Sequence, residues 1–71
     1  MHEMAIAEGI LDIALEEARK NGAARIAKVG LLIGEMAGVE TSSLEFCFHA
    51  LVKGTIAEGA ELALVRTPIM A

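Results

Sequence analysis

The first three residues, Met1-His2-Glu3, bring together more potential metal ligands than any other stretch of the sequence. They supply an α-amine, two backbone amides that a strongly bound metal can deprotonate, one imidazole and one carboxylate. The rest of the chain holds only one further histidine and a single cysteine. Because only a chain terminus carries the amine, this chemistry requires Met1 to be the first residue of the mature protein.

The spacing of these donors suits chelation of Ni(II) or Cu(II). Five-membered rings would link the amine and the amides of His2 and Glu3, and a six-membered ring would link the His2 amide to the imidazole Nδ1. Ions with tetragonal preferences favour such nitrogen donors. The His2 amide cannot be cis to three partners in one square plane, so the site must drop a donor, become octahedral or borrow a ligand. The alternative is a solvated terminus with an incidental histidine, which is common at chain ends.

The remaining candidate ligands favour structural roles. We expect His49, near the end of a predicted helix where an imidazolium is favoured, to face solvent rather than bind a metal. Cys47 lies on the apolar stripe of the same helix and is interpreted as a small core residue. Glu35 and Glu40 could donate oxygen but are expected to be solvated loop charges. The sequence contains no paired carboxylates, catalytic triad or phosphate loop, so we expect no enzymatic activity.

Length and charge narrow the function classes further. A chain of 71 residues predicts one domain, 1–71, with a marginal core. The net charge of −4, the lack of a basic run and the two aromatic residues argue against nucleic-acid binding. Acidic residues near the start argue against a signal peptide, and no run of about 20 apolar residues could span a membrane. We therefore expect a soluble, cytoplasmic protein.

Apolar periodicity predicts a helix over residues 4–21. Its apolar face comprises Ile6, Ile10, Ile13 and Ala14, flanked by Leu11, Leu15 and Ala18. We expect Glu16 to pair with Lys20 one turn later, and Gly22 to cap the helix. Gly9 is unusual inside a helix; we expect close helix packing over it, and the alternative is local flexibility near the terminus.

The second part of the chain predicts a strand, a helix and another strand. The first strand covers residues 24–33, with Val29, Leu31 and Ile33 on one face. Leu32 on its other face is unexpected for solvent, so that face is either partly covered or meets another chain.

A capping box of Ser42 and Glu45 predicts a helix over residues 42–53. A strand over residues 60–67 follows it, and a short strand at residues 1–4 is a further option. A right-handed crossover would make the two long strands parallel if they are adjacent. We predict an α+β fold with two helices on one face of a small, incomplete sheet, because two long strands are few for an independent sheet.

Several segments together resemble the HypA/HybF family of hydrogenase nickel-incorporation proteins. They are Met1-His2-Glu3-Met4-Ala5-Ile6-Ala7, Gly34-Glu35-Met36-Ala37-Gly38-Val39, Gly54-Thr55 and Glu58-Gly59-Ala60-Glu61-Leu62. The resemblance runs from Met1 to about Pro68. It implies a metallochaperone that helps insert Ni(II) into nickel–iron hydrogenase, binding nickel through Met1, His2 and Glu3. The alternative function is a protein-interaction module of a maturation complex.

The resemblance also implies a GTPase of the HypB type and the hydrogenase large subunit as partners. The family carries a second, zinc-binding domain built from paired CxxC motifs, and no zinc ligands of this kind occur in residues 1–71. We therefore expect the chain to be a fragment that lacks this domain and the strand that returns after it. An incomplete sheet leaves an open edge, which predicts a homo-oligomer, with exchanged strands as one form of it.

Overall fold

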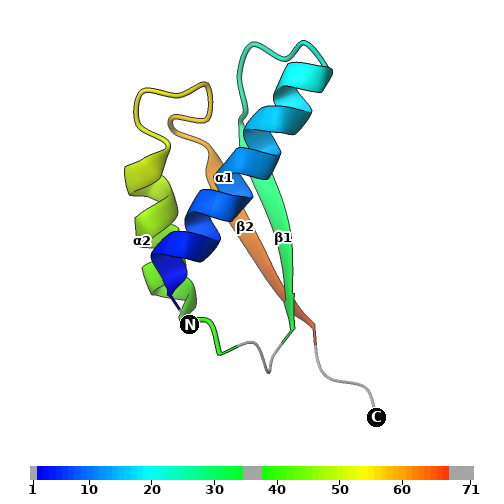
Figure 1. Ribbon diagram of the computed structural model, residues 1–71. Helices are drawn as coiled ribbons and strands as arrows, with labels where there is room; N and C mark the ends of the chain where they lie inside the picture. The colour runs from blue at the N-terminus through cyan, green and yellow to red at the C-terminus, as the bar shows by residue number, and fades with distance from the viewer. Residues whose placement is uncertain (1, 35–37, 68–71) are drawn as a thin grey trace.

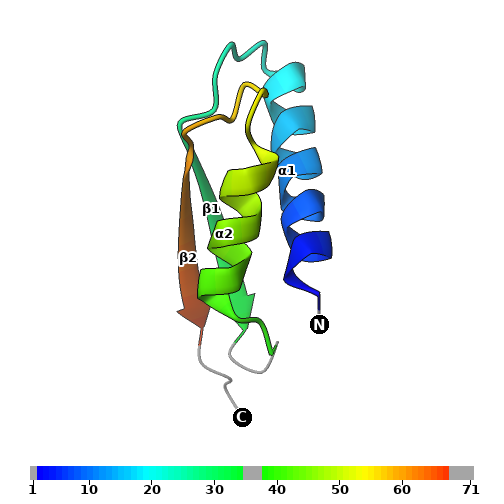
Figure 2. The same cartoon turned by 90° about the vertical axis from the view of Figure 1, so that its left-hand side faces the viewer.

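The computed structural model describes residues 2–34 and 38–67, and their elements follow the order helix, strand, helix, strand (Figure 1). The elements are α1 (Glu3–Lys20), β1 (Lys28–Gly34), α2 (Thr41–Leu51) and β2 (Glu61–Thr67). The strands are parallel, with Lys28 opposite Glu61 and Gly34 opposite Thr67. Both helices cover the same face of this sheet (Figure 2). The predicted α+β fold with two helices on one face is therefore confirmed.

The core lies between the helices and the sheet. Leu44 and Phe48 of α2 and Ala7 of α1 are fully buried, and Ile33 and Leu62 from the two strands are almost so. The inner faces of both strands follow the predicted alternation, because side chains of a strand point alternately to opposite sides. The helical crossover through α2 returns the chain to the start of the sheet, which gives the predicted parallel pairing.

Helix α1 ends where the sequence indicated. The N–H of Gly22 donates to the Arg19 carbonyl at 3.3 Å, and the N–H of Ala23 donates to the Ala18 carbonyl at 2.9 Å. This pair of bonds is the Schellman motif, which requires a left-handed residue after the C-cap Asn21. Gly22 has φ +65°, a conformation that a side chain would strain.

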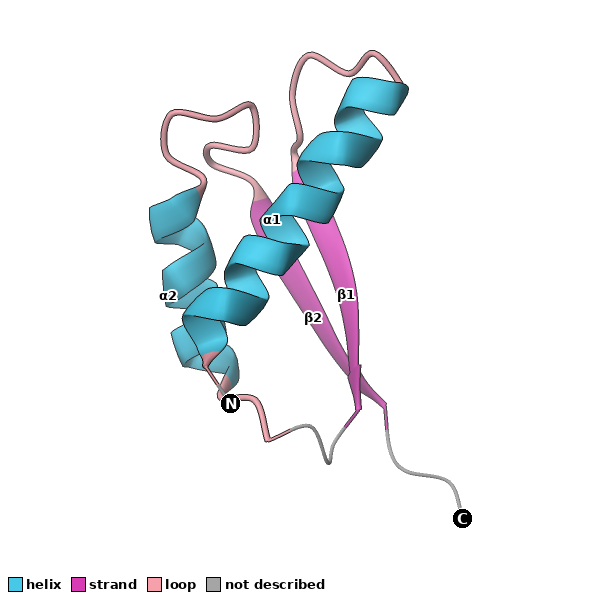
Figure 3. Cartoon of the chain, in the orientation of Figure 1, coloured by secondary structure: helices cyan, strands magenta, loops and turns pink. Residues whose placement is uncertain are grey.

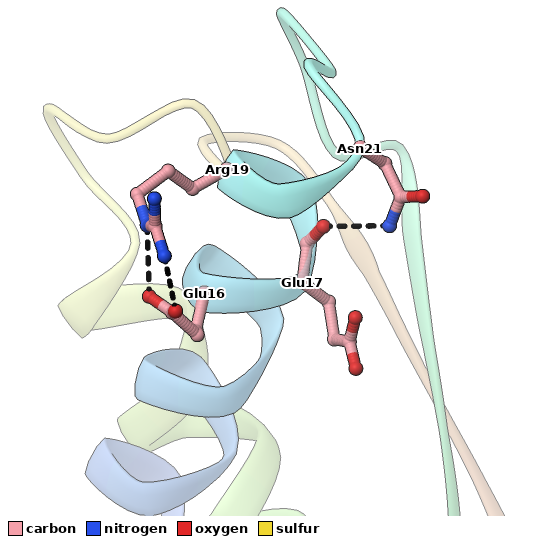
Figure 4. Close-up of polar contacts among 4 residues, drawn as sticks. All are labelled: Glu16, Glu17, Arg19 and Asn21. Carbon is pink, nitrogen blue, oxygen red and sulfur yellow. Dashed lines mark hydrogen bonds and ion pairs between the residues drawn. The ribbon is translucent and has the colours of Figure 1, made fainter.

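A cluster of polar contacts lies along the last turns of α1 (Figure 4). The guanidinium of Arg19 donates two hydrogen bonds to Glu16, one of them from Nε to Oε2 at 3.0 Å. These bonds lower the pKa of the Glu16 carboxyl and raise the pKa of Arg19. The predicted pairing of Glu16 with Lys20 is wrong, because Arg19 is close enough to take both oxygens. The Asn21 side-chain amide donates to the Glu17 carbonyl at 2.7 Å.

The starts of two elements differ from the prediction. Strand β1 begins at Lys28, four residues after the predicted start, because the chain first crosses from the end of α1 to the sheet. In that crossing, the Ile26 N–H donates to the Ile56 carbonyl at 2.9 Å. The predicted short strand at residues 1–4 is wrong, since His2 is the N-cap of α1 and Glu3 is already helical. Met1 lies outside the described residues, as do 35–37 of the predicted connection.

The predicted capping box at the start of α2 is also wrong. The helix begins one residue earlier, at Thr41, with Glu40 as its N-cap. The Glu40 Oε1 accepts hydrogen bonds from the Ser42 N–H at 3.0 Å and from the Ser42 hydroxyl. The Glu40 carboxylate thus satisfies one orphan N–H of the first helical turn, the role of an N-cap side chain, whereas a cap at Ser42 would have satisfied an N–H further along.

Three residues of the helix–sheet unit are more exposed than their sequence context suggested. Gly9 is exposed, and a Cβ added there would meet nothing within 4 Å, so the predicted packing over it is absent among the described residues. Ile13, assigned to the apolar face, is 68% exposed. On the outer face of the sheet, Leu32 is 71% exposed and stands beside Val65, its partner in the register.

Candidate metal centre

The candidate site begins at His2, which precedes the first turn of α1. His2 has extended backbone angles, φ −90° and ψ 110°, and its carbonyl accepts a hydrogen bond from the Ile6 N–H at 3.2 Å. Its side chain is exposed and makes no capping bond to the helix. The carbonyl is therefore used to start the helix, while the imidazole remains open to a ligand from solvent.

The backbone amide of Glu3 is the second available donor. Glu3 is the first residue of α1, and helical geometry provides no intrahelical acceptor for the N–H groups of the first turn. A metal that replaces this proton would therefore break no helical hydrogen bond. The amine lies on Met1, which is outside the described residues.

The carboxylate of Glu3 joins the starts of the two helices, which lie close together (Figures 1 and 3). Its Oε2 accepts a hydrogen bond from the backbone N–H of Glu40 at 3.3 Å. Glu40 in turn caps α2 through Ser42. The first residues of the chain are thus tied to a segment 37 positions away. Sequence patterns offered no signal for this contact, since nothing local relates the two glutamates.

Glu3 and Glu40 lie at a corner of the molecule where α1 and α2 both begin, and the electrostatic effects at this corner oppose one another. Two helix N-termini meet there, and each carries the partial positive charge of its dipole, which disfavours a cation. The carboxylates of Glu3 and Glu40 supply two negative charges at the same place. Deprotonated amides would add further negative charge around a bound divalent ion. The acidic side chains therefore offset the unfavourable helix potential.

The other sequence candidates lie away from this corner. His49 is exposed near the other end of α2, about 13 Å along the helix from Glu40 at 1.5 Å per residue. Its ring makes an edge contact with Phe48, with centroids 6.1 Å apart. Cys47 is half-buried and packs against the core, as expected. Glu35 lies outside the described residues.

Side chains alone do not form a metal site in the described part of the chain. Across residues 2–34 and 38–67, no group of three His, Cys, Asp or Glu side chains is arranged to hold an ion. A metal centre at the start of α1 would therefore draw mainly on the imidazole and on backbone nitrogen.

Within residues 2–34 and 38–67, no helix has the length and apolar character needed to cross a bilayer.

The same fold occurs in the solution structure of the Ni metallochaperone HypA from Helicobacter pylori, with a TM-score of 0.83 and 25% sequence identity. The match covers 94% of this chain and 58% of that one. The two helices on a small parallel sheet are thus an arrangement shared with a nickel metallochaperone.

The chain belongs to the family described as hydrogenase/urease nickel incorporation, metallochaperone, hypA, whose sequence model matches residues 1–71. A hydrogenase maturation factor HypA from Chlorobaculum tepidum is 47% identical over 64 residues, which is 90% of this chain and 57% of that protein. A second, from Chlorobium limicola, is 56% identical over 62 residues, covering 87% and 53%. The chain thus spans a little over half the length of these relatives.

Proposed function

We propose that Met1, His2 and Glu3 bind Ni(II) as cargo, and that the protein supplies this nickel to a nickel–iron hydrogenase during its maturation. Membership in a hydrogenase/urease nickel-incorporation family supports the metal, and relatives named hydrogenase maturation factor support the hydrogenase as its destination. The observation that carries the site is the exposed His2 at the start of α1, next to a Glu3 amide that has no helical acceptor.

The donor set favours a metal ion that accepts strong nitrogen ligands. An amine, an imidazole and deprotonated amides suit Ni(II), whereas Mg²⁺ and Ca²⁺ prefer oxygen. Glu3 contributes its backbone nitrogen, while its carboxylate holds the Glu40 amide and positions the terminus against α2. Binding and release of the ion involve no bond-making in a substrate, so the proposed role is delivery without catalysis.

The proposal includes the partners that delivery requires. A GTPase of the HypB type and the large subunit of the hydrogenase would receive or exchange the nickel in the cytoplasm. Relatives carry the name hydrogenase maturation factor, which supports a hydrogenase as one of these partners. If a purified HypB-type GTPase fails to associate with the chain in both its nickel-loaded and nickel-free forms, that partner is removed from the proposal.

Calorimetric titration of Ni(II) into the untagged protein tests the site. We expect binding to be lost in His2→Ala and also in a variant with one extra residue before Met1, which moves the amine out of reach. His49→Ala is the matched control, because it removes the other exposed histidine and should bind nickel normally. Unchanged affinity in both terminal variants would overturn the site and favour the alternative, a protein-interaction module.

A further inference from the structure

The backbone torsion ψ of His2 separates two amide nitrogens that one metal ion would have to bring together. A five-membered ring of the metal, the His2 nitrogen, Cα, the carbonyl carbon and the Glu3 nitrogen closes only when both nitrogens lie on the same side of the His2 Cα–C bond. The torsion about this bond is ψ, and its value at His2 is 110°. The conformation of His2 therefore differs from the one that such a chelate needs.

Rotation about this single bond connects the two conformations. His2 has φ −90°, a value that belongs both to extended backbone and to the allowed region near the helix, where ψ is about 0°. A change in ψ alone therefore ends in an allowed conformation that has both nitrogens on the same side. The His2 side chain makes no capping bond that would hold ψ at its extended value.

The rotation leaves the rest of the helix in place. The His2 carbonyl and all of α1 lie on one side of the rotated bond, so the hydrogen bond from the Ile6 N–H to this carbonyl, at 3.2 Å, is retained. The bond from the Glu40 N–H to the Glu3 carboxylate, at 3.3 Å, lies on the same side and is retained as well. The imidazole, the His2 nitrogen and Met1 are the groups that move relative to α1.

We propose that nickel binding moves His2 from the N-cap into α1, so that the helix of the nickel-loaded protein begins one residue earlier. This inference rests on the proposed function, because it takes the amides of His2 and Glu3 as ligands of one ion. Met1 then becomes the N-cap, since the residue before the first helical one holds that position. Its carbonyl becomes the acceptor for the N–H four residues later, which belongs to Ala5.

The change gives the Ala5 N–H a hydrogen bond that it lacks in the described part of the chain. The first four N–H groups at a helix start have no intrahelical acceptor, and in α1 these belong to His2, Glu3, Met4 and Ala5. The first N–H of the helix with a backbone acceptor is that of Ile6. Extension of α1 by one residue moves this boundary from Ile6 to Ala5.

The two forms differ in shape at the start of α1. The imidazole of His2 lies at a different position around the helix end in each form, while the contact between Glu3 and Glu40 holds the neighbouring start of α2 fixed. A partner that contacts this corner can therefore bind the two forms with different affinity, and that difference is what shifts a conformational equilibrium. A protein that receives nickel could in this way favour the loaded form.

Amide hydrogen exchange of the untagged protein, with and without one equivalent of Ni(II), tests the proposal. An acid quench releases the metal before mass spectrometry locates the retained label at single residues. We expect the Ala5 N–H to exchange about two- to tenfold more slowly with nickel, as one hydrogen bond of ordinary net strength would cause. The Gly22 N–H, which is bonded to the Arg19 carbonyl at the opposite end of α1, is the internal control and should be unchanged. Equal slowing at both positions would mean a general stabilisation and overturns the proposal.

Calorimetry on the same samples separates this proposal from the proposed function. Nickel binding without slower exchange at Ala5 overturns the extension of α1 and leaves the nickel site intact, whereas absence of nickel binding overturns both. The variant with one extra residue before Met1 is the matched control, because its amine cannot join the chelate. Nickel should leave its Ala5 exchange unchanged, and slower exchange there would also overturn the proposal.

Discussion

Replacement of Glu3 by alanine removes the contact that ties the start of α1 to the start of α2. The lost hydrogen bond to the Glu40 N–H, at 3.3 Å, contributes about 0.5–1.5 kcal/mol in typical cases. The lost negative charge at the helix N-terminus adds about 0.3–1 kcal/mol. We therefore expect the free energy of unfolding to fall by about 1–2 kcal/mol, which lowers Tm by roughly 4–8 °C per kcal/mol in a domain of this size.

Thermal unfolding followed by circular dichroism measures this effect at one fixed protein concentration. Glu8→Ala is the control, because Glu8 is an exposed carboxylate of the same helix beyond its first turn, and we expect a change below about 0.5 kcal/mol. Nickel affinity should fall by no more than about tenfold in Glu3→Ala, since the backbone donors remain and tenfold equals ~1.4 kcal/mol. Equal destabilisation by both substitutions would refute the tie between the helices.

Three further predictions concern the scaffold. Leu44→Ala should destabilise the fold by about 2–5 kcal/mol, measured by denaturant unfolding, because the side chain is fully buried. Gly22→Ala should lower the free energy of unfolding by about 1–2 kcal/mol, because alanine is strained at the positive φ of this position. Gly9→Ala should raise the free energy of unfolding by about 1 kcal/mol, because alanine favours the helix interior and meets no neighbour there. Both are measured by denaturant unfolding at low micromolar concentration. Carboxyl NMR should place the pKa of Glu16 below its ordinary value, and Arg19→Gln should restore the ordinary value. The small stabilisation by the Glu16–Arg19 pair is present above the ordinary glutamate pKa. It disappears as the pH falls through the lowered pKa of Glu16 in the folded state.

The features that the sequence predicted correctly are those determined by neighbouring residues or by a short connection. Gly22 after Asn21 ended the first helix as predicted, because only glycine adopts the left-handed cap without strain. The parallel pairing followed from a single helical crossover between two strands. The exposure of Leu32 was anticipated as an anomaly, and it remains one in the described part of the chain.

Contacts between distant segments account for most of the differences. Glu40 caps α2 in place of the predicted Ser42, and its own N–H is held by Glu3 from the other end of the domain. Glu16 pairs with Arg19 rather than with Lys20. Exposed ion pairs three and four residues apart on a helix have similar energies, so sequence spacing alone does not predict which of the two forms. For the candidate site, the sequence placed His2 and Glu3 at an accessible terminus, but the anchoring of Glu3 required the fold.

In the proposed site, the amine of Met1 and the imidazole of His2 bind Ni(II) together. Native mass spectrometry after selective acetylation of the terminal amine tests whether the amine is required. We predict that the unmodified chain gains one nickel ion with displacement of amide protons, whereas the acetylated chain at the same nickel concentration gains none. Equal nickel loading of the acetylated chain would contradict this requirement.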